Sequence, residues 1–237
     1  MALSETAEKA IVAYGGRLLW QSARRVEAEV SVTGLAFTLK WRPFFRHAKL
    51  VEEVRRPFSR ITPIGRRPGI SGVLEGGDVR LEDERGKVVS ERPNARDYFT
   101  VGRRLFWWDD LDMAYFSNYA FWNYMTLPAM LMNEEISWTE LEPGLLRASF
   151  PDKIPSHSRI QQFRFDLDSG RLIQHDYTAD IISPLATAAN VVLNHAKNAD
   201  GLVYASERRV TPRSPQGKPL PLPVLIHIKV HDYRLIS

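Results

Sequence analysis

The chain has 237 residues, of which 44% are hydrophobic and 25% are charged, the balance of an ordinary globular protein. This composition excludes a disordered chain, a collagen and a small disulfide scaffold. Because the sequence contains no cysteine, it also excludes structural disulfides, thiolate metal sites and cysteine nucleophiles.

The net charge is +4, and residues 1–104 carry most of the basic surplus, with 20 basic and 13 acidic side chains. The arginines of this half occur in pairs within segments whose sequence is typical of strands or turns, so we expect no nucleic-acid partner. The first residues lack the basic and apolar regions of a secretion signal, which predicts a cytoplasmic protein. The most apolar stretch, residues 111–132, contains polar residues and Pro128, so we expect no integral membrane association.

The N-terminal segment predicts a helix over residues 4–15, with Ser4 as its cap and two glycines at its end. After this helix the spacing of the apolar residues changes to every second residue. Apolar residues alternate with polar ones over residues 26–33 and again over residues 35–41, which predicts a hairpin that turns at Gly34.

Further strand-sized pieces follow, separated by short turns rich in glycine. They cover residues 47–56, 58–63, 69–75, 78–84 and 87–91. Short strands joined by tight turns predict that residues 24–104 form a meander, which curls into a barrel or half-barrel.

The middle of the chain predicts a buried helix over residues 110–132, with Asp109 or Asp110 as its N-cap. Its residues are apolar on almost every face, so we expect neighbours all around it. Pro128 should kink or divide it. An aromatic helix of this kind can fill the concave side of a curved sheet.

Alternation resumes after the helix and predicts C-terminal strands within residues 145–236. The expected strands are residues 145–150, 159–166, 171–178, 202–211 and 224–235, with residues 183–197 helical or irregular. The second and third should form a hairpin across Asp168–Gly170. We therefore expect a mainly β (α+β) fold, a curved antiparallel sheet that forms an open or half barrel around a buried aromatic helix, in a single domain of residues 1–237.

This order of elements resembles the half-barrel of the outer-membrane lipoprotein carriers (LolA/LppX-type) and their mycobacterial lipid-binding relatives. The text YAFWNYMTLPAML at residues 119–131, FPDKIPSHSR at 150–159 and HDYTADI at 175–181 is more similar to a bacterial family of unknown function that is predicted to share that fold. The resemblance implies an antiparallel sheet wrapped around helices, with a hydrophobic cavity on its concave side.

The aromatic helix supplies the first group of candidate site residues. In one interpretation its side chains are ordinary core. In the other, Tyr119, Trp122 and Tyr124 line a pocket for an apolar ligand, because aromatic rings combine a large contact area with a polar tip. Asn118 and Asn123 are costly to bury without partners, so each should bond to backbone or to a ligand.

A second group lies near the predicted hairpin. The stretch Pro155–Arg159 brings His157, which we add to the ligand-binding candidates, and Arg159. The next strand carries His175 and Tyr177 on one face and Asp176 on the other. Together these side chains form a candidate proton-transfer or anion-orienting site at one rim. The alternative is a solvated rim with weak surface ion pairs.

Other motifs in the sequence give little evidence for a functional site. The acidic run at residues 109–112 lacks the later ligands of a calcium loop and is explained by helix capping. His227 and His231 have poor chelate spacing on a strand. The text contains no glycine-rich phosphate loop and no nucleophile elbow, so we expect no cofactor, no metal and no serine hydrolase.

The sequence therefore predicts a protein whose partner is a lipophilic or amphiphilic small molecule, bound in the concave cavity of the half-barrel. The alternative is a cofactor-independent enzyme of the cyclase or isomerase type that acts on a hydrophobic metabolite in the same cavity. A protein-interaction module without a small ligand is the third possibility.

Overall fold

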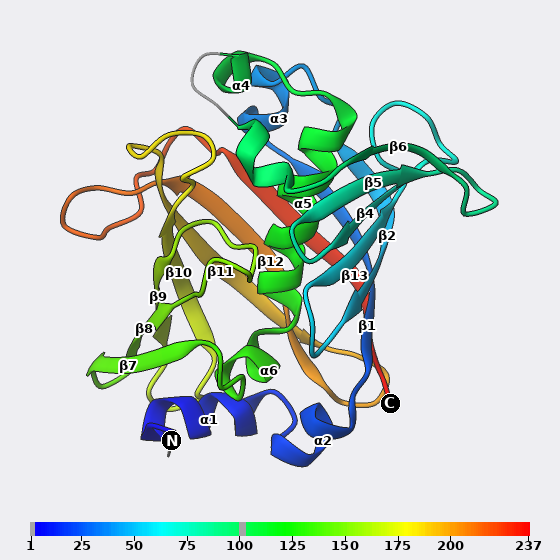
Figure 1. Ribbon diagram of the computed structural model, residues 1–237. Helices are drawn as coiled ribbons and strands as arrows, with labels where there is room; N and C mark the ends of the chain where they lie inside the picture. Colours follow the sequence, from blue (N-terminus) through cyan, green and yellow to red (C-terminus); the bar gives the residue numbers. More distant parts are fainter. Residues whose placement is uncertain (1–2, 100–102) are drawn as a thin grey trace.

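The computed structural model describes residues 3–99 and 103–237. Its described strands form one antiparallel sheet of thirteen strands, in the order β6-β5-β4-β3-β2-β1-β13-β12-β11-β10-β9-β8-β7. The sheet curls around a central helix, α5 (Figure 1). This arrangement confirms the predicted fold class, a curved antiparallel sheet around a buried aromatic helix.

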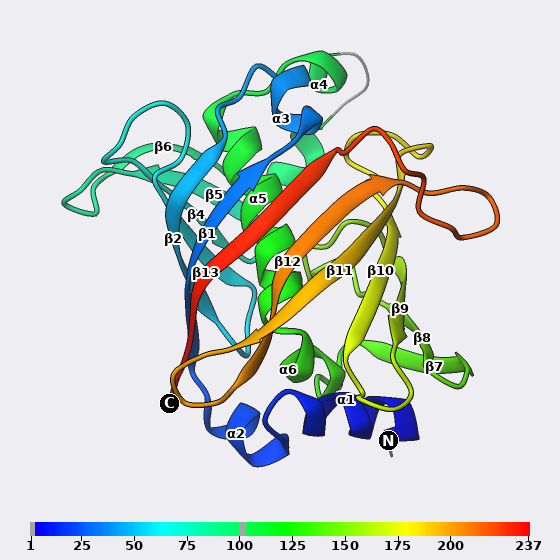
Figure 2. The ribbon, with the colours of Figure 1, turned by 180° about the vertical axis from the view of Figure 1, so that it is seen from behind.

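The sheet is two meanders joined by the pairing of the first strand with the last. The first six strands are β1 (Arg25–Thr33), β2 (Phe45–Glu53), β3 (Phe58–Thr62), β4 (Ser71–Glu75), β5 (Asp78–Glu82) and β6 (Val88–Arg92). The other seven are β7 (Ser137–Glu142), β8 (Leu145–Ser149), β9 (Ile160–Phe165), β10 (Leu172–Thr178), β11 (Thr187–Lys197), β12 (Val203–Pro212) and β13 (Ile226–Ile236). The view from behind shows β1 and β13 side by side in the middle of the convex face (Figure 2).

The helices fill the concave side and cover the ends of the sheet. They are α1 (Glu5–Ala13), α2 (Arg17–Ser22), α3 (Leu35–Leu39), η1 (Ala95–Tyr98), α4 (Arg103–Phe106), α5 (Asp110–Met125) and α6 (Leu127–Leu131). Helices α1 and α2 lie across one end of the sheet, and α3 and α4 lie at the opposite end (Figure 1). None of the helices in the described ranges is long and apolar enough to cross a membrane.

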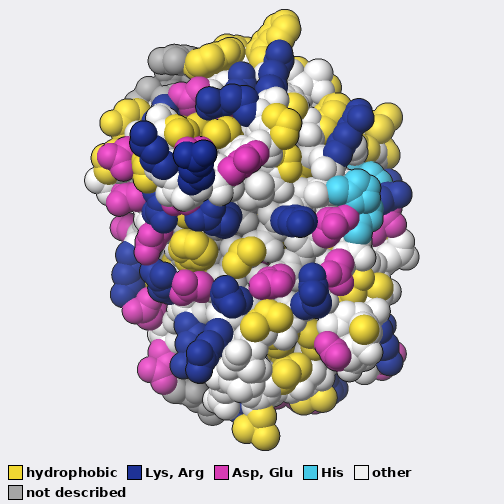
Figure 3. Space-filling view, turned by 90° about the vertical axis from the view of Figure 1, so that its right-hand side faces the viewer, with side chains coloured by type: hydrophobic (Ala, Val, Ile, Leu, Met, Phe, Trp, Pro, Cys, Tyr) yellow, Lys and Arg dark blue, Asp and Glu magenta, His cyan; other side chains and the backbone are white. Residues whose placement is uncertain are grey.

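Some arginines of residues 1–104 form ion pairs on the outer surface. Arg56 pairs with Glu53 and Glu75, and Arg80 pairs with Glu75 and Glu82. Figure 3 shows acidic and basic side chains interspersed over this side of the molecule. Such a mixed surface does not form the single-sign stripe that is typical of a nucleic-acid interface.

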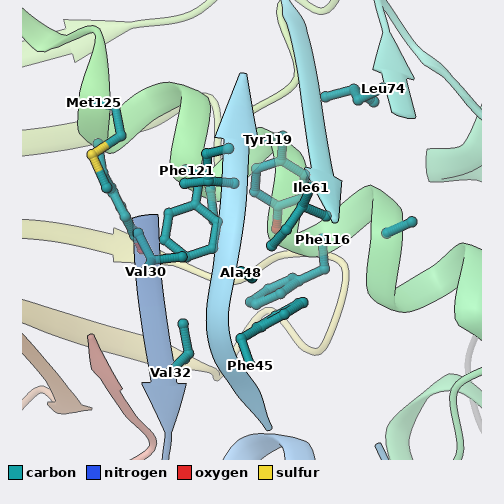
Figure 4. Packing of buried hydrophobic residues seen from close by; sticks show 14 of the residues in the cluster. Val30, Val32, Phe45, Ala48, Ile61, Leu74, Phe116, Tyr119, Phe121 and Met125 are labelled. Atoms are coloured by element: carbon teal, nitrogen blue, oxygen red, sulfur yellow. The ribbon is translucent and has the colours of Figure 1, made fainter. Parts of the chain in front are cut away.

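Helix α5 is the centre of the core. Asp109 caps it and forms a capping box with Asp112, and every residue from Leu111 to Met125 is buried. Its apolar side chains pack against those of β1, β2 and β3 (Figure 4). The helix ends at Met125, and Pro128 lies in the first turn of the separate helix α6, where a missing N–H costs nothing. The predicted division at this proline is confirmed.

Most predicted strands are confirmed, as is the hairpin of β9 and β10, but the predicted strand over residues 35–41 is wrong. Residues Leu35–Leu39 form helix α3, and β1 pairs with β2 and β13 instead. Gly34, with φ of 125°, turns the chain out of the sheet. The amides of Leu35 and Ala36 then donate to the carbonyls of Val224 and Leu225, which holds the helix in place.

The expectation of a helical or irregular segment over residues 183–197 is also wrong, because Thr187–Lys197 is the long strand β11. Register shifts at Asn194 interrupt its alternation of buried and exposed residues, so the period of two is hidden in the sequence. Helix α2 and the edge strand β7 were also not predicted from the sequence. Of the predicted meander over residues 24–104, residues 100–102 lie outside the described residues.

Candidate functional site

A layer of polar side chains is buried between α5 and the inner face of strands β9 to β12. Its centre is the hydroxyl of Tyr124, which lies 2.8 Å from Nε2 of His157 and 2.8 Å from the hydroxyl of Tyr177. His157 is fully buried and Tyr177 is 5% exposed. The three side chains therefore form a hydrogen-bonded chain that is shielded from bulk water.

The register of the strands explains why the polar side chains gather there. His175 lies opposite Asn190 in β11, and Asn190 lies opposite Val210 in β12. Arg208 precedes Val210 by two residues and so points to the same inner face. These positions place a histidine, an amide and a guanidinium on neighbouring strands facing Tyr124.

The loop between β8 and β9 brings His157 into this layer. Its imidazole stacks on the ring of Tyr177, with centroids 3.7 Å apart and planes 5° apart. The side-chain amide of Asn123 donates to the carbonyl of Pro155, and the amide of Asp180 donates to the carbonyl of His157. Both ends of the loop segment are thus fixed, one to α5 and one to the chain after β10.

Burial keeps the histidines of the layer neutral. Desolvation lowers the pKa of His157 to about 3, and it lowers the pKa of His175 well below the ordinary value. Nε2 of His175 lies 2.6 Å from Oε1 of Gln161, and its ring stacks on Phe163 at 4.0 Å. The same desolvation raises the pKa of Tyr124 to about 12. At neutral pH neither histidine carries a charge.

Several buried polar atoms of this layer have no hydrogen-bond partner among the described residues. They are the hydroxyl of Tyr119, Nδ1 of His157, Oδ1 of Asn123, and Nε and Nη1 of Arg208. Asn190 joins them, because its amide faces the Tyr124 hydroxyl without good hydrogen-bond geometry. Native interiors contain few such groups, so their concentration in one layer marks it as a candidate site.

A pocket of about 400 Å³ opens where the β8–β9 loop meets η1. We call it the seam pocket. Its lining residues are Gly77, Asn94, Arg96, Asp97, Tyr115, Phe150, Pro151, Asp152, Ile154, Pro155, Ser156, Arg159 and Asp180. Nη1 of Arg96 donates to the carbonyl of Ser156 at 2.9 Å, and Nη2 of Arg96 lies 3.9 Å from the carboxylate of Asp180. These contacts connect the two halves of the curled sheet across the front of α5.

The structure separates the predicted ligand-binding residues into two groups. Tyr119, Asn123, Tyr124 and His157 belong to the buried polar layer. Asn118 does not, since it accepts from Ser59 and donates to the carbonyls of Gly72 and Ala114 on the β3–β4 side of α5.

Trp122 is also outside the layer. Its indole Nε1 donates to the carbonyl of Glu53 at 2.8 Å, which fixes α5 to the end of β2. The hydrogen bonds of Asn118 and Trp122 are of the kind that hold a helix on a sheet.

The predicted rim residues are separated as well. His175 pairs with Phe163, four residues from Arg159, so His175 is buried whereas Arg159 is exposed in the seam pocket. Tyr177 shares the inner face with His175. Asp176 points to the other face, where it lies 3.6 Å from Arg213 and accepts from Gln174.

Four residues of the site were not predicted from the sequence: Arg96, Gln161, Asn190 and Arg208. The signal for Arg208 was present, because the alternation of β12 places it on the face of Val210. Asn190 was hidden by the irregular alternation of β11. No group of three or more metal-ligating side chains occurs among the described residues.

Comparison with solved structures supports this architecture. A LolA superfamily protein from Nitrosomonas europaea aligns over 100% of this chain and 95% of its own, with a TM-score of 0.54 and 7% identity. The chain has a LolA-like fold. A putative outer membrane lipoprotein-sorting protein domain from Vibrio parahaemolyticus gives a TM-score of 0.52 at 13% identity, covering 98% of this chain and 91% of that one.

A DUF1329 family protein from Desulfovibrio piger is similar over 97% of this chain and 91% of its own, with a TM-score of 0.50 and 12% identity. No protein-family model and no curated protein matches the sequence. The predicted resemblance of the fold to the lipoprotein carriers is confirmed, and these low identities establish the fold alone.

Proposed function

We propose that this LolA-like chain binds an amphiphilic small molecule in the seam pocket, with the lipophilic part against the apolar wall and the polar end at the rim. The wall consists of Tyr115, Phe150 and Ile154, and the rim carries Arg159 and the Arg96–Asp180 pair. A volume of about 400 Å³ is within the range of small-molecule sites. Burial of apolar surface supplies roughly 25 cal/mol per Å².

The observation that carries the proposal is the position of the seam pocket relative to α5. Helix α5 fills the concave side, and the cavity between it, α6 and strands β12 and β13 is only about 20 Å³. A lipophilic molecule of ordinary size therefore does not fit in that cavity, whereas the seam pocket is large enough to hold one. The fold supports the proposal because one of the similar structures is a putative outer membrane lipoprotein-sorting protein domain.

The rim determines which polar end is suitable. Arg96 and Arg159 present cationic groups, and Asp97, Asp152 and Asp180 present carboxylates. A head group with both charges, or an uncharged head with hydroxyl groups, can use both kinds of partner. We therefore expect zwitterionic single-chain amphiphiles to bind more tightly than simple fatty acids.

Gly77 offers a direct test. It lines the pocket, and a Cβ added there meets no atom within 4 Å. The variant Gly77→Phe should fill the pocket and leave the fold intact. Calorimetric titration with dodecylphosphocholine below its micelle concentration should show binding to the parent chain and at least a tenfold loss in Gly77→Phe. Equal binding by both chains would exclude the seam pocket as the site.

A second candidate function is cofactor-independent catalysis on such a molecule. The observation that favours it is the neutral Tyr124–His157–Tyr177 chain, because His157 directly follows the pocket-lining Ser156 in the sequence. Preorganised donors in a dry site can stabilise developing charge. Substitution of Tyr177 by Phe should then reduce turnover of a bound substrate far more than its affinity, and unchanged turnover would argue against this role.

A further inference from the structure

Arg208 is a buried cation without a buried counter-charge. Its side chain points from β12 to the concave face and is 3% exposed. Its Nη2 donates to the backbone carbonyl of Tyr124 at 3.3 Å, and its guanidinium carbon lies 5.1 Å from the centre of the Tyr124 ring. No described carboxylate forms an ion pair with it, and its Nε and Nη1 have no hydrogen-bond partner.

These free N–H groups belong to a side chain that lines the small internal cavity of about 20 Å³. Its other lining residues are Tyr14, Trp20, Tyr124, Met125, Leu127, Pro128, Val203, Tyr204, Ala205 and Tyr233. None of them is acidic. The cavity lies where α2, the start of α6 and strands β12 and β13 meet, and it shares no lining residue with the seam pocket.

Neighbouring polar groups are already engaged. The hydroxyl of Tyr14 lies 2.9 Å from Nε2 of His195 and accepts from the amide of Leu172. Tyr233 donates to the carbonyl of Met125, and Trp20 donates to the carbonyl of Tyr14. Among the buried side-chain atoms around this cavity, the unpartnered ones are therefore the two guanidinium nitrogens of Arg208.

An isolated charge in such surroundings is unfavourable. A guanidinium stays protonated in proteins, and removing one from water costs several kcal/mol unless an opposite charge is close. One carbonyl and one aromatic face compensate for only part of this cost. An anion beside Nε and Nη1 would supply both the missing charge and the missing acceptors.

We propose that the cavity beside Arg208 is a binding site for one small monovalent anion, of the size of a halide or a single carboxylate group. The volume sets the size, because about 20 Å³ holds little more than one or two water-sized groups. Sulfate and phosphate are too large, and their second charge has no partner. The anion is either a free ion or the carboxylate of an amphiphile that enters between α2 and α6.

The test uses thermal unfolding of the full chain at constant ionic strength, with sodium bromide replacing sodium methanesulfonate, whose sulfonate group is as bulky as sulfate. Binding to the folded state alone should raise Tm by about 5–10 °C at a hundredfold excess over Kd. In Arg208→Met the increase should disappear, and the variant should be at least as stable as the parent chain in methanesulfonate. Arg209→Met, which removes an exposed guanidinium from the same strand, is the matched control and should keep the response.

Sodium formate and sodium dodecanoate distinguish the two sources. A response to bromide and formate assigns a free anion, whereas a response to dodecanoate alone, lost in Arg208→Met, assigns the carboxylate of an amphiphile. If Arg208→Met does not fold, anomalous scattering from bromide-soaked crystals of the parent chain decides, with a peak expected beside the guanidinium. The proposal would be overturned if the crystals showed a water molecule and no bromide at that position. It would also be overturned if Arg208→Met gave the same response to bromide as the parent chain.

Discussion

The imidazole of His157 lies face to face with the phenol ring of Tyr177, with centroids 3.7 Å apart, while both polar tips meet the hydroxyl of Tyr124. Either hydroxyl can donate in the hydrogen bond between Tyr124 and Tyr177. When Tyr177 donates, the hydroxyl of Tyr124 can in turn donate to Nε2 of His157. This single hydroxyl joins α5, the β8–β9 loop and β10.

The first prediction concerns that hydroxyl. Tyr124→Phe leaves Nε2 of His157 and the hydroxyl of Tyr177 buried without a partner, which should lower the free energy of unfolding by about 1–3 kcal/mol. Tyr177→Phe should cost less, since Tyr124 keeps His157. Urea unfolding of both single variants and the double variant gives the coupling energy. Strictly additive losses would show that the three groups do not act as one network.

The second prediction concerns pH. Desolvation lowers the pKa of His157 to about 3 and that of His195 to about 4, both below the ordinary value of about 6.5 in an unfolded chain. Between these values the unfolded chain binds protons that the folded chain does not. The stabilisation is therefore complete above pH ~6.5 and is lost as the pH falls toward 4, by up to about 1.4 kcal/mol per pH unit for each histidine.

Urea unfolding at pH 7 and pH 5 measures this slope. His157→Phe keeps an aromatic ring against Tyr177 but removes the titrating group, so its stability should fall less between the two pH values. The matched control is His231→Asn, which removes an exposed imidazole and should keep the full slope. Equal slopes in the parent chain and in His157→Phe would contradict the neutral state of the buried His157.

Elements that depend on neighbouring residues could be predicted from the sequence, whereas elements that depend on distant contacts could not. The alternation of β1 and the apolar faces of α5 are local properties, and both elements were predicted. Helix α3 depends on hydrogen bonds to residues 224 and 225, almost two hundred positions away. The alternation of apolar and polar residues over 35–41 gives no indication of these hydrogen bonds. Propensity within a window cannot supply a tertiary contact of that kind.

The candidate site follows the same rule. Tyr124, His157 and Tyr177 were each selected from the sequence, but their meeting depends on a loop that folds back onto α5. Arg159 and His175 were expected at the same rim. The observed register of β9 and β10 places His175 opposite Phe163, four residues away from Arg159. Arg208 was missed because a charged residue in a strand is normally assigned to the solvent face.

A third prediction tests the N-terminus of α5. The carboxylate of Asp109 accepts from the amide of Asp112, and both carboxylates pair with Arg92. Asp109→Ala removes the cap and should lower the free energy of unfolding by about 0.5–2 kcal/mol. Asp109→Ser keeps a capping oxygen and should recover part of the loss. Equal losses in the two variants would assign the whole effect to the ion pair with Arg92.

The fourth prediction concerns the contact between α5 and β4. A Cβ added to Gly72 would lie 2.7 Å from the Cβ of Ala114, whereas one added to Gly77, in the turn after β4, meets nothing within 4 Å. Gly72→Ala should therefore lower the free energy of unfolding by about 1–3 kcal/mol through overpacking. Gly77→Ala should change it by less than about 0.5 kcal/mol.

The double variant Gly72→Ala, Ala114→Gly separates crowding from other causes. Removal of the Ala114 methyl group relieves the clash, at a cost of about 1 kcal/mol in helix propensity. The double variant should thus be more stable than the sum of the two single losses predicts. A purely additive result would mean that α5 does not approach β4 as closely as the structure places it. The concave side would then be packed less tightly than described. The assignment of ligand binding to the seam pocket depends on that tight packing and would have to be reconsidered.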